Sequence, residues 1–195
     1  AGRGIVHSER TPDRLRGTTF QKHGLQTWIA LPVDQEEAEP AFRHYPAATL
    51  PVLERDGARI TVVAGTAFGA ASPVEVASPT LYASLELRAG ATLAIPDDHA
   101  ERGLYPVEGE LELDGFPLPN DHIAVLDAGT SPVLRALTDA RVMLVGGAPL
   151  DGPRHVWWNF VSHSRERIEQ AKADWAAGRM GAVPGETEFI PLPER

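Results

Sequence analysis

Leu81-Tyr82-Ala83-Ser84-Leu85-Glu86-Leu87 shows the plainest β-strand pattern in this sequence of 195 residues. Every second residue from Leu81 is apolar, and Tyr82, Ser84 and Glu86 alternate with them. Side chains of a strand point alternately to its two faces. The pattern therefore predicts a strand with one face in a hydrophobic core and the other facing outward.

Strands of similar length are predicted on both sides of this one. Asp56-Gly57 and Asp114-Gly115 are strong hairpin signals, because an Asp-Gly turn provides the positive φ that the turn needs at its centre. Residues 65–79 are rich in Gly, Ala, Ser and Pro, so we expect a loop there. Many short strands with frequent turns predict an all-β sandwich or barrel. The other predicted strands are 52–55, 59–63, 91–95, 104–107, 111–113, 123–126, 133–137 and 142–145.

The two ends of the chain differ from this central part. Gly4 to Glu9 and His23 to Pro32 are each predicted to form a strand. Between the second of these and the central strands, Asp34 to Pro46 is predicted to be a linker, because it is acidic and bounded by proline. The last residues, Val183 to Arg195, are rich in proline and are predicted to form an extended tail.

One helix is predicted, from Ser164 to Ala177. Ile168 and Ala171 fall on one face at helical spacing, which is typical of a helix that packs on a core. Ser164 can cap the start of the helix, and Gly178 can end it. The opposite face is predicted to be solvated and carries Arg165, Glu169 and Lys172.

The composition excludes several classes of function. The formal net charge of −9 argues against direct nucleic-acid binding, which needs a concentrated basic surface. The chain has no cysteine, which excludes disulfides, thiolate nucleophiles and sulfur-ligated metal centres. No apolar run reaches the length of a membrane span, and no secretory signal is visible. We therefore expect a cytoplasmic protein with no membrane partner.

His7 and Glu9 are two good metal ligands one residue apart. Residues i and i+2 of a strand point to the same face, so the imidazole and the carboxylate would lie side by side. Such a pair is half of a typical site for iron or another first-row divalent metal. The alternative is two polar residues on the wet face of an edge strand. His99 and Glu101 repeat the spacing, but we expect them to be an exposed loop pair.

Several motifs taken together resemble the pirin family of bicupin proteins. The front of the chain contributes Ala1–Glu9, which contains the His-Ser-Glu motif, and His23–Gln26. The resemblance covers nearly the whole chain. The C-terminal motifs are Gly146–Leu150, Val156–Val161, Glu166–Ala171, Asp174–Trp175, Ala177–Gly181, Pro184–Gly185 and Phe189–Pro193.

This resemblance implies two stacked cupin barrels, each a double-stranded β-helix. The chain would hold a remnant of the first barrel and the linker at residues 1–45, and the whole second barrel at residues 46–150. A C-terminal helix and an extended tail would occupy residues 151–195. The first part of the N-terminal cupin would be missing.

The resemblance also implies a metal site, because pirins bind Fe²⁺ or another divalent transition metal in the first barrel through three histidines and one glutamate. By this resemblance, His7 and Glu9 are the third histidine and the glutamate. The early His-x-His motif that supplies the other two histidines is absent from this sequence. His23 and His44 share no strand spacing with another histidine, so we do not expect them to replace it.

The resemblance further implies an enzyme similar to quercetin 2,3-dioxygenase (EC 1.13.11 type), whose metal binds a small aromatic substrate, a flavonol, together with dioxygen. Glu9 would accept the proton of the flavonol hydroxyl. This activity needs a complete first barrel. The alternative is a non-catalytic protein-interaction or transcription-cofactor role, or an inactive fragment. Exposed strand edges would then favour a protein partner or self-association.

Overall fold

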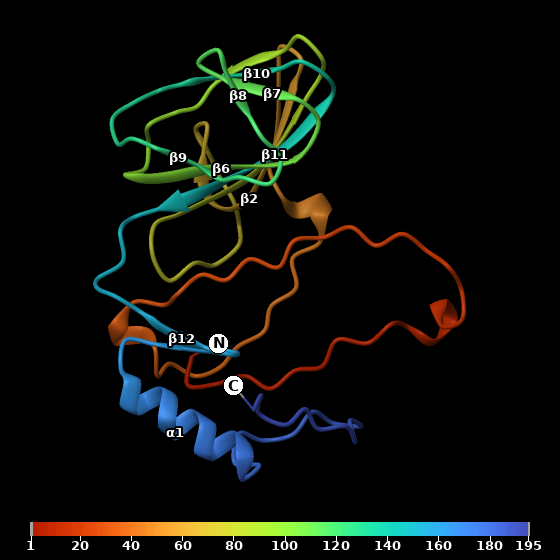
Figure 1. The fold of residues 1–195 in the computed structure, drawn as a ribbon, viewed down its shortest axis with the longest axis vertical. Helices are drawn as coiled ribbons and strands as arrows, with labels where there is room; N and C mark the ends of the chain where they lie inside the picture. Colours follow the sequence, from red (N-terminus) through yellow and green to blue (C-terminus); the bar gives the residue numbers. More distant parts are fainter. Residues whose placement is uncertain (1, 195) are drawn as a thin grey trace. The chain divides into compact units, whose positions relative to one another are not determined.

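The computed structural model describes residues 2–194. In it, strands β1 to β11 form two antiparallel sheets that face each other across a common core (Figure 1). The larger sheet has the order β1-β2-β4-β11-β6-β9, with β3 paired to β2, and the smaller sheet has the order β5-β10-β7-β8. The strands are β1 (Val52–Arg55), β2 (Ala58–Ala67), β3 (Ala70–Ala71), β4 (Thr80–Leu87), β5 (Thr92–Ala94), β6 (Glu101–Glu108), β7 (Leu111–Leu113), β8 (Phe116–Leu118), β9 (Ala124–Leu126), β10 (Val133–Ala136) and β11 (Ala140–Gly147).

Contacts divide the chain into two units. The barrel unit, Arg43–Pro149, holds both sheets, and the terminal unit joins the residues up to Phe42 with those from Leu150 onward. The terminal unit contains a hairpin and a helix. Its elements are β12 (His155–Trp157), β13 (Phe160–Ser162), α1 (Arg165–Ala176) and two short 3₁₀ helices, η1 (Asp13–Leu15) and η2 (Val33–Gln35), while a third, η3 (Ala47–Thr49), lies in the barrel unit.

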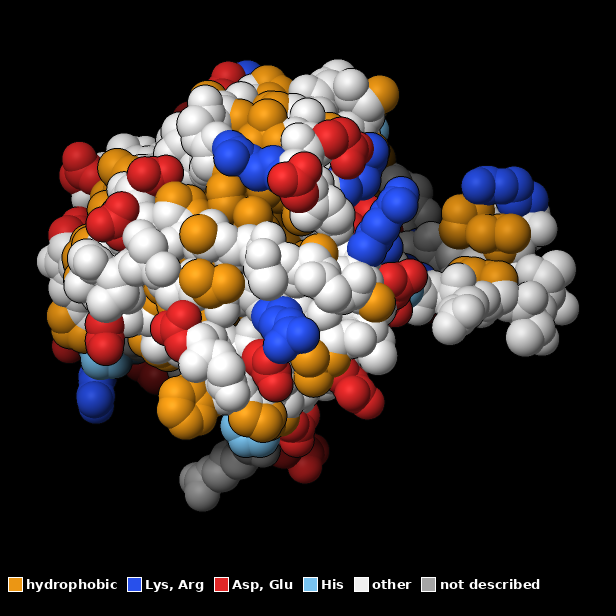
Figure 2. All heavy atoms as spheres, turned by 90° about the horizontal axis from the view of Figure 1, so that it is seen from above, with side chains coloured by type: hydrophobic (Ala, Val, Ile, Leu, Met, Phe, Trp, Pro, Cys, Tyr) orange, Lys and Arg blue, Asp and Glu red, His pale blue; other side chains and the backbone are white. Residues whose placement is uncertain are grey.

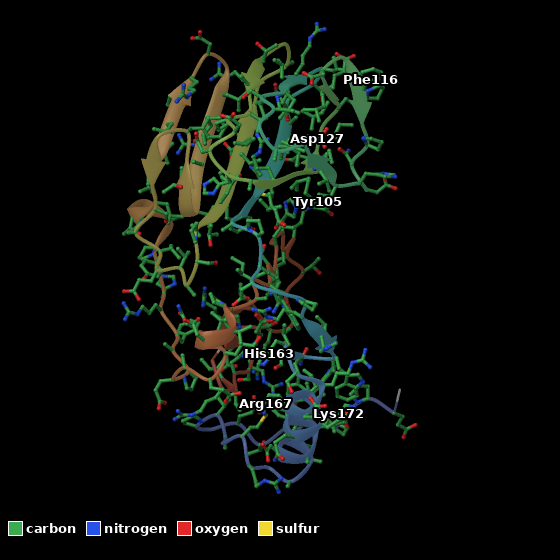
Figure 3. All side chains as sticks on the ribbon, turned by 90° about the vertical axis from the view of Figure 1, so that its left-hand side faces the viewer. Tyr105, Phe116, Asp127, His163, Arg167 and Lys172 are labelled. Carbon is green, nitrogen blue, oxygen red and sulfur yellow. The ribbon has the colours of Figure 1, made fainter. Side chains whose placement is uncertain are left out.

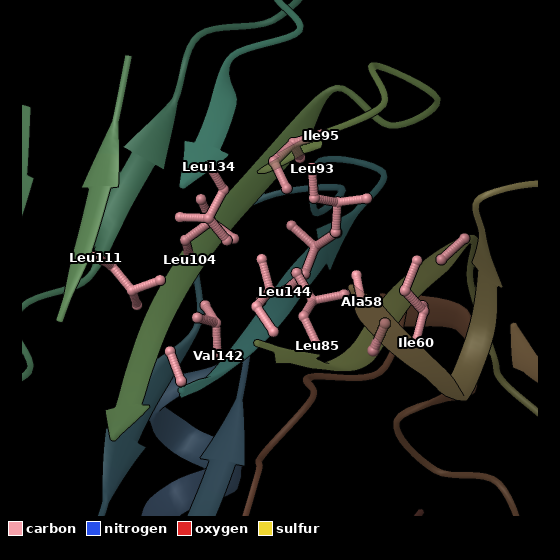
Figure 4. Close-up of a cluster of buried hydrophobic side chains, with 14 of the residues drawn as sticks. Ala58, Ile60, Leu85, Leu93, Ile95, Leu104, Leu111, Leu134, Val142 and Leu144 are labelled. Atoms are coloured by element: carbon pink, nitrogen blue, oxygen red, sulfur yellow. The ribbon is translucent and has the colours of Figure 1, made fainter. Parts of the chain in front are cut away.

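The core of the barrel unit is built from alternate residues of both sheets (Figure 4). Ile60, Leu85 and Leu144 come from the larger sheet and Leu134 from the smaller, and all four are fully buried. Burial of such a side chain contributes about 1.5–3 kcal/mol. Burial also alternates along residues 81–87, so the strand predicted there is confirmed.

Both predicted Asp-Gly hairpins are confirmed. Arg55 pairs with Ala58 across the first turn, and Leu113 pairs with Phe116 across the second. The φ angles of Asp114 and Gly115 are 50° and 82°. Two positive values are characteristic of the tight turn that matches the twist of the flanking strands.

The loop predicted at residues 65–79 is wrong in its first part. Strand β2 continues to Ala67, and β3 pairs with it in a short hairpin, with Ala67 opposite Ala70. Small residues carry no apolar alternation, so the pattern hides the strand, but they let backbones approach closely. A Cβ at Gly65 would lie 1.7 Å from the Thr80 carbonyl oxygen, so only glycine fits this crossing.

Helix α1 begins and ends close to its predicted bounds. The hydroxyl of Ser164 accepts a hydrogen bond of 3.2 Å from the backbone N–H of Arg167, which confirms the cap. Ile168 and Ala171 are buried, as their spacing predicts. Gly178 follows the helix with a φ of 66°, a conformation that favours glycine.

The two strands predicted at the front are wrong. Residues 4–9 and 23–32 have no strand assignment, and the side chains of Trp28 and Ile29 are 52% and 53% exposed. A strand needs a neighbouring strand to pair its backbone groups, and alternation alone does not supply one. The hairpin β12–β13 was missed for the opposite reason: its turn contains Trp158 at a φ of 49°, which no turn signal indicates.

Candidate functional site

His7 and Glu9 lie in the terminal unit, in a segment without regular secondary structure. Both residues are exposed. Neither side chain makes a hydrogen bond or an ion pair with another residue of the described range 2–194. The strand that was predicted to align the two side chains does not form, so other contacts hold this motif in place.

One anchor of the segment lies just before the motif, at Arg3. Its backbone N–H donates to the Ala38 carbonyl oxygen at 3.0 Å, and its guanidinium pairs with Glu39 at 2.6 Å. Arg167 of helix α1, which Figure 3 labels, donates to the Arg3 carbonyl oxygen at 3.3 Å. The start of the chain is thus attached to residues far from it in sequence.

A second anchor lies just after the motif, at Arg10. Its guanidinium contacts the carboxylates of Glu186 and Glu188, at 2.6 and 2.9 Å. The hydrogen bond from Arg10, helped by backbone N–H groups, lowers the pKa of Glu186 to about 2. Because the Arg3 and Arg10 anchors flank His7 and Glu9, the motif is held at both ends and its side chains are left free.

We expect Glu186 to titrate near pH 2 instead of near its ordinary pKa of 4.5. A carboxyl whose pKa is lower in the folded state stabilises the fold above the ordinary value, and this stabilisation is lost as the pH falls from about 4.5 to about 2. A carboxyl carbon titration by NMR measures this directly. Arg10→Gln should move the midpoint back toward the ordinary value, while Arg3→Gln should leave it unchanged. A midpoint near the ordinary value in the parent chain would contradict this anchor.

The described residues do not fit a metal ion by themselves. Within residues 2–194 there is no group of three or more His, Asp or Glu side chains placed to hold one. His7 and Glu9 provide two donors, whereas metal sites in enzymes commonly have three or more protein ligands. His23 and His44 are both exposed and do not join the pair.

His99 and Glu101 do not form a second pair of ligands. His99 was predicted to be exposed, but it is half-buried, and its Nε2 lies 3.0 Å from the Thr66 carbonyl oxygen. The same nitrogen lies 3.1 Å from the Thr66 hydroxyl, so the imidazole is engaged by Thr66 of β2. Glu101 is exposed at the start of β6.

Sequence reasoning missed a largely enclosed acid, Glu36, in the segment predicted to be a linker; its side chain is 10% exposed. Its carboxylate accepts hydrogen bonds from the Ser162 hydroxyl at 3.0 Å and from the His163 backbone N–H at 3.0 Å. His163 Nδ1 lies 2.7 Å from the same carboxylate. Burial raises the pKa of Glu36, but the hydrogen bonds from His163 and Ser162 together lower it by more. The net result is a pKa below the ordinary value of the carboxyl group.

Arg154 extends this buried network. Its side chain is only 5% exposed, and its Nε lies 2.9 Å from Glu36, at an angle that makes an ion pair and not a hydrogen bond. The guanidinium also donates to Asp151 and to the Leu31 carbonyl oxygen. Asp151 in turn accepts from the Val33 N–H at 2.8 Å. These contacts attach residues 31–36 to the chain that leads into β12.

A second buried cation lies in the barrel unit. Arg102 on β6 is 2% exposed. Its guanidinium donates to three backbone carbonyl oxygens, those of Pro96 and Asp127 at 2.6 Å and that of Thr130 at 2.8 Å. Arginine is the side chain whose donors can bridge several acceptors at once. Arg102 therefore connects two loops to the strand between them.

The aromatic residues of the terminal unit have a structural role. Trp175 packs edge-on against Trp158 and stacks on Phe189, and its indole N–H donates to the Ile190 carbonyl oxygen at 2.8 Å. The tail predicted to be extended is thereby held against α1. On the helix face predicted to be solvated, Arg165 and Glu169 are exposed. Lys172, labelled in Figure 3, is half-buried, and its ammonium lies 4.2 Å from the ring centroid of Trp157.

Charged side chains of both signs are interspersed on the face shown in Figure 2. Among the described residues, no helix has the length and apolar character that crossing a membrane requires.

Comparison with known proteins agrees with this architecture. Residues 82–181 match the family model of the pirin C-terminal cupin domain. A pirin-like protein of Caulobacter vibrioides is 48% identical over 100% of this chain and 67% of its own length. A Pseudomonas aeruginosa protein whose name proposes quercetin 2,3-dioxygenase activity is 39% identical over 95% of this chain and 59% of its own length. The crystal structure of quercetin 2,3-dioxygenase from Acinetobacter baumannii matches 86% of this chain and 58% of its own, with a TM-score of 0.77 and 32% identity.

The two facing antiparallel sheets and this structural match define a cupin protein. The family match and the Caulobacter relative specify it further: the chain belongs to the pirin family. It spans about two thirds or less of the length of these relatives.

Proposed function

We propose that this chain is part of a metal-dependent dioxygenase that acts on a flavonol such as quercetin. The observation that carries the proposal is the similarity to the Acinetobacter baumannii quercetin 2,3-dioxygenase over 86% of this chain. In this proposal residues 1–45 are the end of a first cupin with its linker, residues 46–150 are the second barrel, and residues 151–195 are the C-terminal helix and tail.

His7 and Glu9 are proposed as two of the ligands of Fe²⁺ or another divalent transition metal, the class of ion that takes imidazole and carboxylate donors together. Because no third donor joins them within residues 2–194, the remaining ligands have to come from further residues or from another chain. Both side chains are exposed and without an ion-pair partner in the described range, so no existing contact has to break when they bind.

Glu9 is also proposed to accept the proton of the flavonol hydroxyl. A general base has to come within hydrogen-bond reach of the proton it accepts, directly or through one water. The Glu9 side chain is exposed and makes no ion pair with the neighbouring Arg10, whose guanidinium is engaged by Glu186 and Glu188. The Arg10 anchor therefore serves the motif indirectly, by keeping its guanidinium away from Glu9.

The test joins this chain to the segment of the Caulobacter vibrioides relative that it does not match. We expect the joined protein to bind close to one equivalent of Fe²⁺ and to consume quercetin together with dioxygen. His7→Ala should weaken metal binding, and Glu9→Gln should lower turnover by roughly 100-fold or more, the usual contribution of a general base. His23→Ala is the matched control and should leave both quantities unchanged, because His23 is an exposed histidine of the same unit.

Two results would contradict the proposal in different ways. If the joined protein binds the metal but leaves quercetin untouched, the dioxygenase activity is wrong. If His7→Ala binds the metal as tightly as the parent does, the ligand assignment is wrong.

A second candidate function is a non-catalytic role in protein association. One observation favours it: the last strand of the larger sheet, β9, has no partner on its outer edge in the described residues, and its central residue, Val125, is an exposed apolar side chain. Unpaired strand edges of this kind are templates for pairing with another chain.

A further inference from the structure

Apart from the two-residue strand β3, the two sheets of the barrel unit end in four edge strands, and three of these four are protected against pairing. Strand β1 carries the charged residues Glu54 and Arg55. Strand β8 exposes Phe116, but its next residue is Pro117, which cannot donate a backbone hydrogen bond to an added strand. Strand β5 exposes only the small side chains of Thr92 and Ala94. Charge, proline and the lack of an apolar face are usual ways to prevent edge pairing.

Strand β9 has none of these protections. It consists of Ala124–Leu126, and Val125 is 81% exposed. Ile123, on the same outer face just before the strand, is 54% exposed. Its side chain lies over Gly103 of β6, where an added Cβ would come within 3.1 Å of it. Tyr105, two residues further along β6, adds a ring that is 38% exposed (Figure 3).

The outer face of the larger sheet is divided into a charged end and an apolar end. At the charged end, residues in register across five strands alternate in sign, and ion pairs of 2.7, 3.1 and 3.9 Å link them. This row consists of Glu54, Arg59, Glu86, Arg141 and Glu108. Charges that already pair with each other offer little to a partner.

At the apolar end, a second row in register crosses the sheet to its unprotected edge. Val145 of β11 lies between Tyr82 and Gly103, and Gly103 pairs with Val125. A partner that extends the sheet at β9 would therefore continue this apolar row. It would not meet the charged one.

Charge decides what kind of partner fits this edge. Asp121 precedes the strand and Asp127, which Figure 3 labels, follows it; both are exposed. Residues 119–131 contain these two aspartates and no Lys or Arg. A second copy placed edge to edge would therefore bring only like charge to the two ends of the strand, which is unfavourable, so a second copy fits poorly. An extended segment with a basic residue at each end fits well.

We propose that the β9 edge binds an extended segment of a partner protein as an added strand, with apolar residues alternating along it and Lys or Arg at both ends. In this mode of recognition the main chain supplies affinity, and alternate side chains supply specificity. This inference names the partner chemistry for the second candidate function, and it requires neither a metal nor flavonol turnover.

The test titrates the metal-free, ¹⁵N-labelled chain with an end-blocked peptide of sequence Lys-Val-Thr-Val-Thr-Lys. We expect the backbone amide signals of residues 123–127 to shift and the amides of β9 to gain protection from hydrogen exchange. Val125→Lys should weaken binding by roughly tenfold or more, because it removes an apolar contact and adds a like charge. Val52→Lys is the matched control, an exposed valine on the opposite edge strand β1, and should bind as the parent does.

The inference is overturned if the peptide shifts no signal of β9, or if Val52→Lys loses as much affinity as Val125→Lys. Equally tight binding of a peptide with Glu in place of both lysines would refute the role given to charge. Sedimentation of the chain without peptide tests whether a second copy binds this edge instead. A dimer that Val125→Lys dissociates would place a second copy there and contradict the proposal. Because every arm uses metal-free protein, an inactive dioxygenase leaves these readouts unchanged.

Discussion

Arg102→Met is expected to lower the free energy of unfolding of the barrel unit by about 4 kcal/mol, because hydrogen bonds to charged groups contribute roughly 1.5–3 kcal/mol each and their loss leaves buried acceptors without partners. The guanidinium donates to the carbonyl oxygens of Pro96, Asp127 and Thr130, and Arg102 is 2% exposed. Water cannot replace these donors without opening the two loops. Methionine fills a similar volume but restores none of the hydrogen bonds.

Denaturant unfolding followed by the tyrosine near-ultraviolet signal measures this effect. Tyr45, Tyr82 and Tyr105 all lie in the barrel unit, whose residues are Arg43–Pro149, and these are the three tyrosines of the chain. Arg135→Met is the control. Arg135 is an exposed arginine of β10 whose guanidinium lies 3.6 Å from Glu112, and its loss should cost less than about 1 kcal/mol. Equal midpoints for Arg102→Met and the parent chain would show that the three contacts carry no stability.

Glu36→Ala is expected to destabilise the terminal unit by about 3 kcal/mol, the usual scale for removing one partner of a buried ion pair. The substitution removes the acceptor of the Ser162 hydroxyl and of the His163 N–H, and it leaves Arg154 with a single carboxylate. Because the pKa of Glu36 is lowered, its stabilisation is present above the ordinary carboxyl pKa. It is lost as the pH falls through the lowered value.

Tryptophan fluorescence reports on this prediction separately from the first. All four tryptophans lie in the terminal unit, at positions 28, 157, 158 and 175. Glu37→Ala is the matched control, because Glu37 is the next residue, is 60% exposed, and pairs with Arg167 at 2.6 Å. It should cost less than about 1 kcal/mol. Equal losses for the two variants would mean that burial does not distinguish these glutamates.

The sequence pattern predicted the strands and turns of the barrel unit well, because they depend on residues that are close together in the sequence. Alternation over residues 81–87 and the turn at Asp114-Gly115 depend on neighbours in sequence, and both are confirmed. The cap of α1 is also local, since Ser164 and Arg167 are three residues apart. The strand predicted at residues 23–32 has a similar pattern but no strand beside it, and it does not form.

For the candidate site, the sequence alone determined which side chains carry metal chemistry. His7 and Glu9 were found from residue type, spacing and resemblance to pirins, and their role as ligands stays a prediction. Only the tertiary structure showed that anchors at Arg3 and Arg10 flank them.

The tertiary structure alone also decided which charges are buried. Nothing in the acidic run from Asp34 to Glu39 distinguishes Glu36 from Glu37, yet one is enclosed and the other is open. The physical reason is distance along the chain. Glu36 is buried by His163, 127 residues away, so its environment exists only after the two ends of the chain have come together.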